Sequence, residues 1–290
     1  MLARHALAAM LLGVAAYPAA AQDAQSLIAK NLEARGGAAA IDAIKSVSFE
    51  GRTIFPGDFE LTYKEVRQRV GAKSAVRYDF GLQGLDVVQS YDGTGAWKIN
   101  PFQGRKDAER MSADEARQFA DEGLVEGPLL ASRTDGSEVQ YLGREDFDGT
   151  LAYKLRVRQK DGDEFTYLLD PDTYLEIKVD ETRRIRGAQQ TTETELGDYE
   201  KVAGVYFPMS VESWQQGSPN QRQRVLIATG LANPPVDGAY FVQPGGPAPL
   251  AKTSPEPPDA SMKPQGKPRT KKAGPASKQA SPATAPKGSK

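Results

Sequence analysis

The chain has 290 residues, a formal net charge of −1, no cysteine and a single histidine, His5. His5 lies in a stretch that has the pattern of a cleaved export signal, so we expect the mature chain to contain neither His nor Cys. This excludes a Ser-His-Asp triad, a Cys-His pair, a zinc site built from Cys and His, and a disulfide framework. A chain without these groups is expected to bind a ligand rather than to transform one.

Residues 1–21 have the pattern of a secretory signal peptide. Arg4 supplies a positive start, residues 6–16 form a short apolar core, and Ala19 to Ala21 provide small residues for cleavage. The core is too short to span a bilayer, and polar sequence follows it directly. We therefore expect cleavage after Ala21 and a periplasmic location, where a large core makes disulfides unnecessary. The alternative is an amphipathic first helix.

Residues 22–243 are expected to form one domain that opens with two short helices. Asp23 is the predicted N-cap of the first helix, and Gly36-Gly37 is the predicted end. A second helical piece is expected over residues 38–44.

Strands follow these helices. In residues 151–158 every odd position is apolar and most even positions are charged, and residues 47–49, 59–63 and 175–180 alternate in the same way. A period of two with one polar face predicts half-buried strands in an antiparallel sheet. We expect roughly ten strands, with turn chemistry at Asp92-Gly93, Asp135-Gly136, Asp148-Gly149, Asp161-Gly162 and Pro171.

One segment between the strands predicts a helix. Ser112 stands three residues before Glu115, which is the spacing of a capping box, and good helix formers continue to Glu122. Residues 123–131 are expected to follow as an apolar loop or short helix. The predicted fold class is therefore mainly β. It is a long, curved antiparallel sheet that either closes into a barrel or stays open with helices across its concave face.

Motifs for catalysis or cofactor binding are weak. The segment from Asp92 to Gly95 is flanked by strands and indicates a hairpin rather than a phosphate loop. Tyr174 and Lys178 have a spacing used by dehydrogenases, but four residues of a strand span about 13 Å, which is too far for proton relay. The short Asp-Gly-Asp and Asp-Pro-Asp segments are too short for a calcium loop. We expect no catalytic residue, cofactor or metal, although a carboxylate pair for glycoside hydrolysis stays open because separation in space is not visible in a sequence.

Aromatic residues cluster in the first half of the domain and suggest a binding surface. Most of them could line one face of the curved sheet, where an apolar surface would accept acyl chains. An ordinary packed core is the alternative. The candidate cavity residues are Phe49, Phe59, Leu61, Tyr63, Phe80, Trp97, Phe102, Leu124 and Leu129.

Three stretches combine glycine, aspartate and aromatic residues at predicted turns: residues 32–51, 91–102 and 143–177. In these stretches the sequence resembles a family of periplasmic proteins described as outer-membrane lipoprotein-sorting, or LolA/LolB-like. The resemblance covers most of residues 22–243. It implies an open antiparallel β-barrel with helices as a lid over an apolar cavity, which holds acyl chains of a lipoprotein or another lipid.

The resemblance favours a soluble carrier over a membrane-anchored receptor, because no cysteine follows the signal to accept a lipid anchor. The candidate lid segments are the one near Phe102 and residues 123–130. Two other interpretations remain open. An envelope interaction module without catalytic activity predicts a filled sheet interior, and a hydrolase predicts two carboxylates about 5 to 9.5 Å apart in a polar cleft.

Residues 244–290 differ in composition from the domain. They consist mainly of Pro, Ala, Ser and Lys, with nine basic and two acidic residues. We expect this tail to be disordered. It could attach an acidic domain to anionic lipid or cell-wall polymer, or it could be a solvating tail without a partner. Its lack of aromatic residues argues against binding to nucleic acid.

Overall fold

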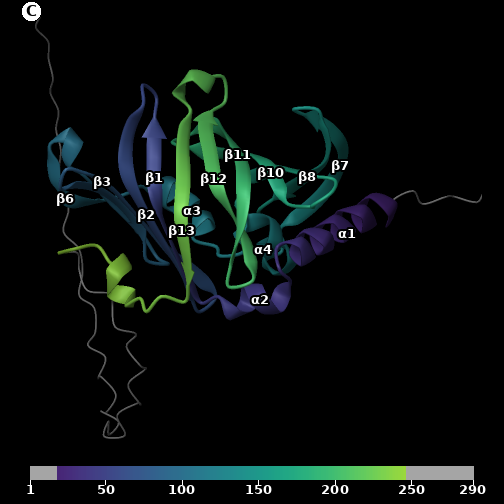
Figure 1. The fold of residues 1–290 in the computed structure, drawn as a ribbon, viewed down its shortest axis with the longest axis horizontal. Coiled ribbons are helices and arrows are strands. Elements are labelled where there is room, and N and C mark those ends of the chain that lie inside the picture. Colours follow the sequence, from purple (N-terminus) through teal and green to yellow (C-terminus); the bar gives the residue numbers. More distant parts are fainter. Residues whose placement is uncertain (1–17, 246–290) are drawn as a thin grey trace, which may run out of the picture. The chain divides into compact units, whose positions relative to one another are not determined.

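The computed structural model describes residues 18–245, in which thirteen strands form one sheet with helices against it (Figure 1). The expected export signal lies outside these residues except for its last four, and the expected tail lies outside them from residue 246. No helix of residues 18–245 has both the length and the apolar character that a membrane span requires.

The first half of the chain contains the following elements: α1 (Pro18–Ala34), α2 (Ala38–Ala43), β1 (Ser46–Phe55), β2 (Phe59–Val70), β3 (Lys73–Leu82), β4 (Leu85–Tyr91), β5 (Ala96–Asn100), the 3-10 helix η1 (Pro101–Gln103), β6 (Arg105–Arg110), α3 (Ala113–Glu122) and α4 (Gly127–Asp135). The second half contains β7 (Glu138–Phe147), β8 (Thr150–Arg158), β9 (Glu164–Leu169), β10 (Glu176–Ile185), β11 (Ala188–Val202), β12 (Val205–Gln215), η2 (Pro219–Gln221), β13 (Gln223–Ala232) and η3 (Gly238–Phe241).

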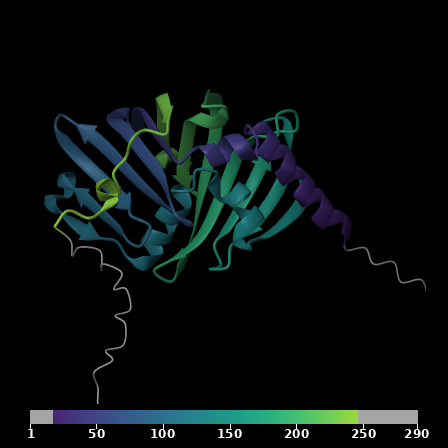
Figure 2. The same cartoon turned by 90° about the horizontal axis from the view of Figure 1, so that it is seen from below.

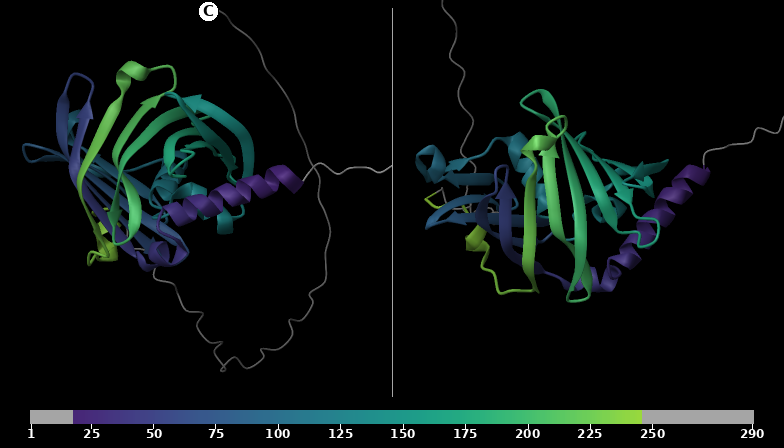
Figure 3. Two further views of the ribbon diagram at one scale, coloured as in Figure 1. Left: turned by 45° about the vertical axis from the view of Figure 1, so that its right-hand side comes forward. Right: turned by 45° about the horizontal axis from the view of Figure 1, so that its top comes forward.

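The sheet consists of two meanders, the first formed by β1 to β6 and the second by β7 to β13, which meet where β1 pairs with β13. Its strand order is β6-β5-β4-β3-β2-β1-β13-β12-β11-β10-β9-β8-β7, and all neighbours are antiparallel. Strands β6 and β7 are the two edges and do not pair with each other. The sheet is therefore curved but open, as the views in Figure 3 show. The predicted mainly β, open fold is confirmed.

The two edge strands are consecutive in the chain, so the segment that joins them must cross the sheet. This crossing segment, residues 111–137, contains α3 and α4, which lie on the concave side (Figure 3). The predicted capping box starts α3. Ser112 Oγ accepts a hydrogen bond from the Glu115 amide at 3.3 Å, and the Ser112 amide donates to Glu115 Oε2 at 2.9 Å.

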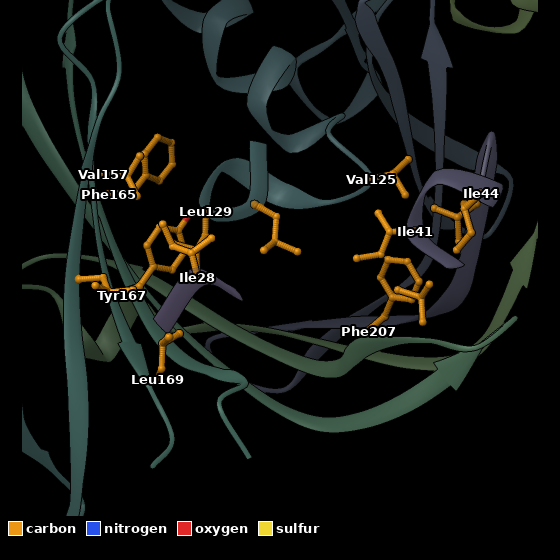
Figure 4. Packing of buried hydrophobic residues seen from close by; sticks show 14 of the residues in the cluster. Ile28, Ile41, Ile44, Val125, Leu129, Val157, Phe165, Tyr167, Leu169 and Phe207 are labelled. Atoms are coloured by element: carbon orange, nitrogen blue, oxygen red, sulfur yellow. The ribbon is translucent and has the colours of Figure 1, made fainter. Parts of the chain in front are cut away.

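The main hydrophobic core lies between the concave face and helices α1, α2 and α4 (Figure 4). Helix residues Ile28, Ile41 and Leu129 are at most 3 % exposed. They pack against side chains from strands in both meanders, including Phe49, Val157, Phe165, Tyr167, Leu169 and Phe207. These helices close one end of the curved sheet and leave space over the rest of the concave face.

Residues 233–245 cover part of the opposite, convex face, where they run across the first meander (Figure 2). The Phe241 carbonyl accepts hydrogen bonds from Trp97 Nε1 at 2.7 Å and from Ser90 Oγ at 3.0 Å. Arg77 Nη1 donates to the Tyr240 carbonyl at 2.9 Å. Phe241, Val66 and Ala75 form a small second core on this side.

The curvature of the sheet includes a β-bulge between β1 and β13. The register shifts between Glu50 and Gly51, and a Cβ atom on Gly51 would lie 2.0 Å from the carbonyl oxygen of Leu226. Only glycine permits this close approach, and bulges bend and twist the strands that carry them.

Four local predictions differ from the structure. Helix α1 begins at Pro18, so Asp23 lies inside it and not at its N-cap. Asp135 ends α4 and Gly136 follows it in the left-handed conformation, so this pair ends a helix and makes no hairpin. Tyr174 precedes β10 instead of lying on it. The strand count was too low because polar strands such as β11 show no apolar alternation.

Candidate functional site

The concave face contains a cavity of about 450 Å³. Strands of both meanders form its walls, and the segment from α3 to α4 forms one side. Because this segment crosses the open sheet, its residues line one side of the cavity.

One wall of the cavity is aromatic. Tyr63 on β2 lies 5.7 Å from Phe80 and 6.3 Å from Tyr78, both on β3, measured between ring centroids. Phe49 on β1 contacts Phe207 on β12 edge to face at 5.2 Å. Side chains alternate between the two faces of a strand, so residues two apart on β2 and β3 share the concave face. Burial raises the pKa of the Tyr63 and Tyr78 hydroxyls well above their usual value, which keeps both neutral.

The same alternation brings charged groups into the cavity next to these rings. Glu65 and Arg67 follow Tyr63 at every second position of β2, and both line the cavity. Glu65 accepts hydrogen bonds from the Tyr63 hydroxyl at 2.6 Å and from Arg67 Nε. The Glu65 side chain is 2 % exposed, so the guanidinium supplies the counter-charge that a buried carboxylate requires.

Three further acidic residues at the cavity pair with arginines on other elements. Arg35, which directly follows α1, binds Glu176 on β10 at 3.2 Å, and the Tyr199 hydroxyl donates a hydrogen bond to the Glu176 backbone carbonyl at 2.8 Å. Arg69 on β2 lies 2.7 Å from Glu126, just before α4. The third residue, Asp121 on α3, is bound by an arginine of the second meander.

That arginine, Arg183 on β10, ties α3 to the second meander. Its side chain is only 3 % exposed, and it binds Asp121 at 2.8 Å, Asp163 before β9, and Glu181 on its own strand. Burial raises the pKa values of Asp121 and Glu181, while the guanidinium opposes that rise. One buried arginine thus binds three carboxylates where the crossing segment packs against the second meander.

Glu122, the last residue of α3, differs from these carboxylates. Within residues 18–245, no basic side chain lies within ion-pair distance of it. Its Oε1 accepts a hydrogen bond from Gln118 Nε2 at 2.8 Å. Burial, and secondly the charge of Glu181, raise the pKa of Glu122 to about 7. Glu122 therefore faces the cavity as a carboxyl group that is about half ionised near neutral pH.

Five of the nine candidate cavity residues line this cavity: Phe49, Tyr63, Phe80, Leu124 and Leu129. The other four lie elsewhere for local reasons. Phe59 and Phe102 are about half exposed, at the β1–β2 hairpin and in η1. Leu61 is buried opposite Thr53, nearer that hairpin. Trp97 points to the convex face, where Phe241 covers it.

The residues that the sequence did not indicate are mainly the charged ones. The cavity was expected to be apolar, but its lining combines aromatic and aliphatic side chains with carboxylates and arginines. A signal was present on β2, where Glu65 and Arg67 occupy positions of the buried face. No group of three or more His, Cys, Asp or Glu that could hold a metal ion occurs among residues 18–245.

The fold is similar to three solved structures of low sequence identity. A DUF1329 family protein from Desulfovibrio piger is 11 % identical, with 76 % of this chain and 98 % of that chain covered and a TM-score of 0.54. A domain from Vibrio parahaemolyticus, described as an outer membrane lipoprotein-sorting protein, is 15 % identical over 75 % and 97 %, with a TM-score of 0.51. A LolA superfamily protein from Nitrosomonas europaea is 15 % identical over 76 % and 98 %, with a TM-score of 0.50. No family model and no curated protein matches the sequence. The likeness shows a LolA-like fold.

Proposed function

Starting from the LolA-like fold, we propose that the chain is a carrier that holds acyl chains of a lipid or lipoprotein in the concave cavity. The observation that supports this most is the cavity itself. An open sheet whose interior were filled would suit an interaction module, but about 450 Å³ remains beside an aromatic wall. This volume falls within the ~300–1,000 Å³ that small-molecule sites usually have. In keeping with the expected export signal, the proposed place of action is the periplasm.

Burial of methylene groups would provide the affinity. Each buried CH₂ contributes about 0.8 kcal/mol, so about ten of them contribute ~8 kcal/mol before the costs of association. A net free energy of that size corresponds to a micromolar dissociation constant. Phe49, Phe80 and Leu129 are the proposed contacts of the chain from the sequence-based set.

The crossing segment is the proposed lid. Leu124 and Val125 on its middle part line the cavity, between the end of α3 and the start of α4. The segment is attached to the sheet by the Arg183 cluster on one side and by the Arg69–Glu126 pair on the other. Cargo exchange requires these contacts to loosen, so release is expected to be slower than for an open groove.

A hydrolase with a carboxylate pair is less well supported. Five of the six carboxylates that line the cavity are bound to arginines, which leaves Glu122 as the one acidic group there without such a partner among the described residues. Glycoside hydrolysis needs a second available carboxylate as base or nucleophile. The ion pairs therefore favour binding over hydrolysis.

The test combines native mass spectrometry of the purified protein with titration of a fluorescent probe that has an alkyl chain and an uncharged head group. Val211 on β12 lines the cavity and is half-buried, so Val211→Trp places a larger side chain in the cavity. We expect this variant to lose probe affinity at least tenfold while keeping its circular dichroism spectrum. Val70→Trp is the matched control, because Val70 is 43 % exposed at the end of β2. Absence of any co-purified lipid, together with no probe binding by the unmodified chain, would refute the proposal.

A further inference from the structure

The cavity has more carboxylates than arginines to balance them. Six acidic residues line it, and the five that are paired share four arginines: Arg35, Arg67, Arg69 and Arg183. Arg183 also binds Asp163, a further carboxylate that has Arg117 on α3 as a second partner at 3.6 Å. Because charges in a poorly solvated space interact strongly, this excess makes the cavity unfavourable for anions and favourable for cations.

Among residues 18–245, no basic side chain forms an ion pair with Glu122. It ends α3, where the helix dipole places partial negative charge, so its carboxylate is disfavoured by the helix as well as by burial. The Gln118 amide donates a hydrogen bond to it at 2.8 Å, and the Tyr78 hydroxyl donates a second one. A cation beside Glu122 would stabilise its carboxylate against both the helix dipole and burial.

Aromatic faces occur in the same part of the cavity. Tyr78 on β3 is the cross-strand neighbour of Glu65, and its ring contacts Phe119 of α3 at 6.1 Å between centroids. It stacks on Phe80 at 6.2 Å and lies 6.3 Å from Tyr63. Amine and quaternary ammonium groups bind over such rings, most strongly where water is excluded. A carboxylate next to a cluster of three rings is the arrangement that recognises these cations.

We propose that the cavity selects amphiphiles whose polar end has a primary amine or a quaternary ammonium group, held by the Glu122 carboxylate against the rings of Tyr63 and Tyr78. This inference rests on the proposed carrier function, because it assigns the polar end of the same ligand. The apolar chain would extend along the wall formed by Phe49 and Phe80. An anionic fatty acid would instead place a second negative charge beside Glu122.

The ionisation of Glu122 gives the proposal a pH dependence. The groups that face Glu122 are Tyr63 on β2, Tyr78 on β3, Glu181 and Arg183 on β10, and Gln118 on its own helix. With its pKa at about 7, Glu122 is mostly protonated at pH 6 and mostly ionised at pH 8. An ammonium group favours the ionised form, so it should bind more tightly at pH 8 and release a proton from Glu122 on binding at pH 6.

Calorimetric titration with three decyl amphiphiles tests the proposal, each below its micelle concentration: decyltrimethylammonium, decanoate and decyl maltoside. At pH 8 we expect decyltrimethylammonium to bind at least tenfold more tightly than decanoate. Glu122→Gln should remove most of this preference, and its affinity for the neutral maltoside reports whether the cavity is intact. Glu33→Gln is the control, because Glu33 is exposed on α1 and the substitution changes the net charge equally.

The outcomes separate the two proposals. Equal affinity for all three compounds, or a preference that persists in Glu122→Gln, would overturn the cation site and leave the carrier function standing. Binding of none of them would overturn both. If Glu122→Gln does not fold, the unmodified chain still decides, because a ratio of affinities that does not change between pH 6 and pH 8 contradicts the role of Glu122.

Discussion

Glu122→Gln should have a higher free energy of unfolding than the unmodified chain at alkaline pH. The difference should be smaller at acidic pH. The carboxyl has an ordinary pKa of 4.5 and a pKa of about 7 in the folded chain. The folded state therefore binds the proton more tightly than the unfolded state, and Glu122 reduces the free energy of unfolding as pH rises from about 4.5 to about 7. A glutamine in its place has no proton to lose and keeps an oxygen that can accept the Gln118 hydrogen bond.

The size of the effect follows from the two pKa values. Each tenfold change in an ionisation constant is worth about 1.4 kcal/mol, so the upper limit is about 3 kcal/mol. Water in the cavity reduces this, and we expect the stability difference between Glu122→Gln and the unmodified chain to grow by about 1–3 kcal/mol between pH 5 and pH 8.

Urea unfolding of the ligand-free protein at both pH values measures this difference. Asp121 and Glu181 also have raised pKa values and contribute to the pH dependence of both proteins, so only the difference between them isolates Glu122. Glu33→Gln provides the baseline for loss of one surface carboxylate. If the free energies of unfolding of Glu122→Gln and the unmodified chain differ by the same amount at pH 5 and pH 8, Glu122 is well solvated and the reasoning is wrong.

Two further substitutions test the contacts of the crossing segment. Arg183→Met leaves three carboxylates without their shared counter-charge, so it should lower the free energy of unfolding in urea by about 3–5 kcal/mol. The control Arg133→Met changes an exposed residue of α4 and should alter the free energy of unfolding by no more than about 0.5 kcal/mol. A loss below about 1 kcal/mol for Arg183→Met would contradict the importance of this cluster. Ser112→Ala removes the cap of α3 and should cost about 1 kcal/mol and speed amide hydrogen exchange in the first turn of α3, and unchanged exchange would argue against the capping box.

Helix α3 shows which features could be predicted. Its start depends on Ser112 and Glu115, which are three residues apart and form their hydrogen bonds within one turn. The alternating strands, the turns at Asp92-Gly93, Asp148-Gly149 and Asp161-Gly162, and the second helix depend on equally short distances along the chain. Asp135-Gly136 shows the limit of such signals, since the same dipeptide is favourable in a hairpin and at a helix end.

Trp97 and Phe49 show why the face of a strand could not be assigned from its pattern. Both are aromatic, on strands of one meander, and almost completely buried. Phe49 faces the cavity, whereas Trp97 lies under Phe241, which is 144 residues away in the sequence. Alternation separates the two faces of a strand but does not say which face the rest of the chain covers.

The sequence was enough to predict the class of structure: a mainly β chain with turns, short helices and a capped helix between strands. Those properties arise from contacts between near neighbours. The three-dimensional fold was needed to establish that β1 pairs with β13 and that α3 crosses the concave face of the open sheet. It also brought Asp121 to Arg183 and left Glu122 facing a cavity without a basic partner among residues 18–245. These contacts join residues more than 50 positions apart, and no local pattern encodes them because their free energy exists only once the sheet has formed.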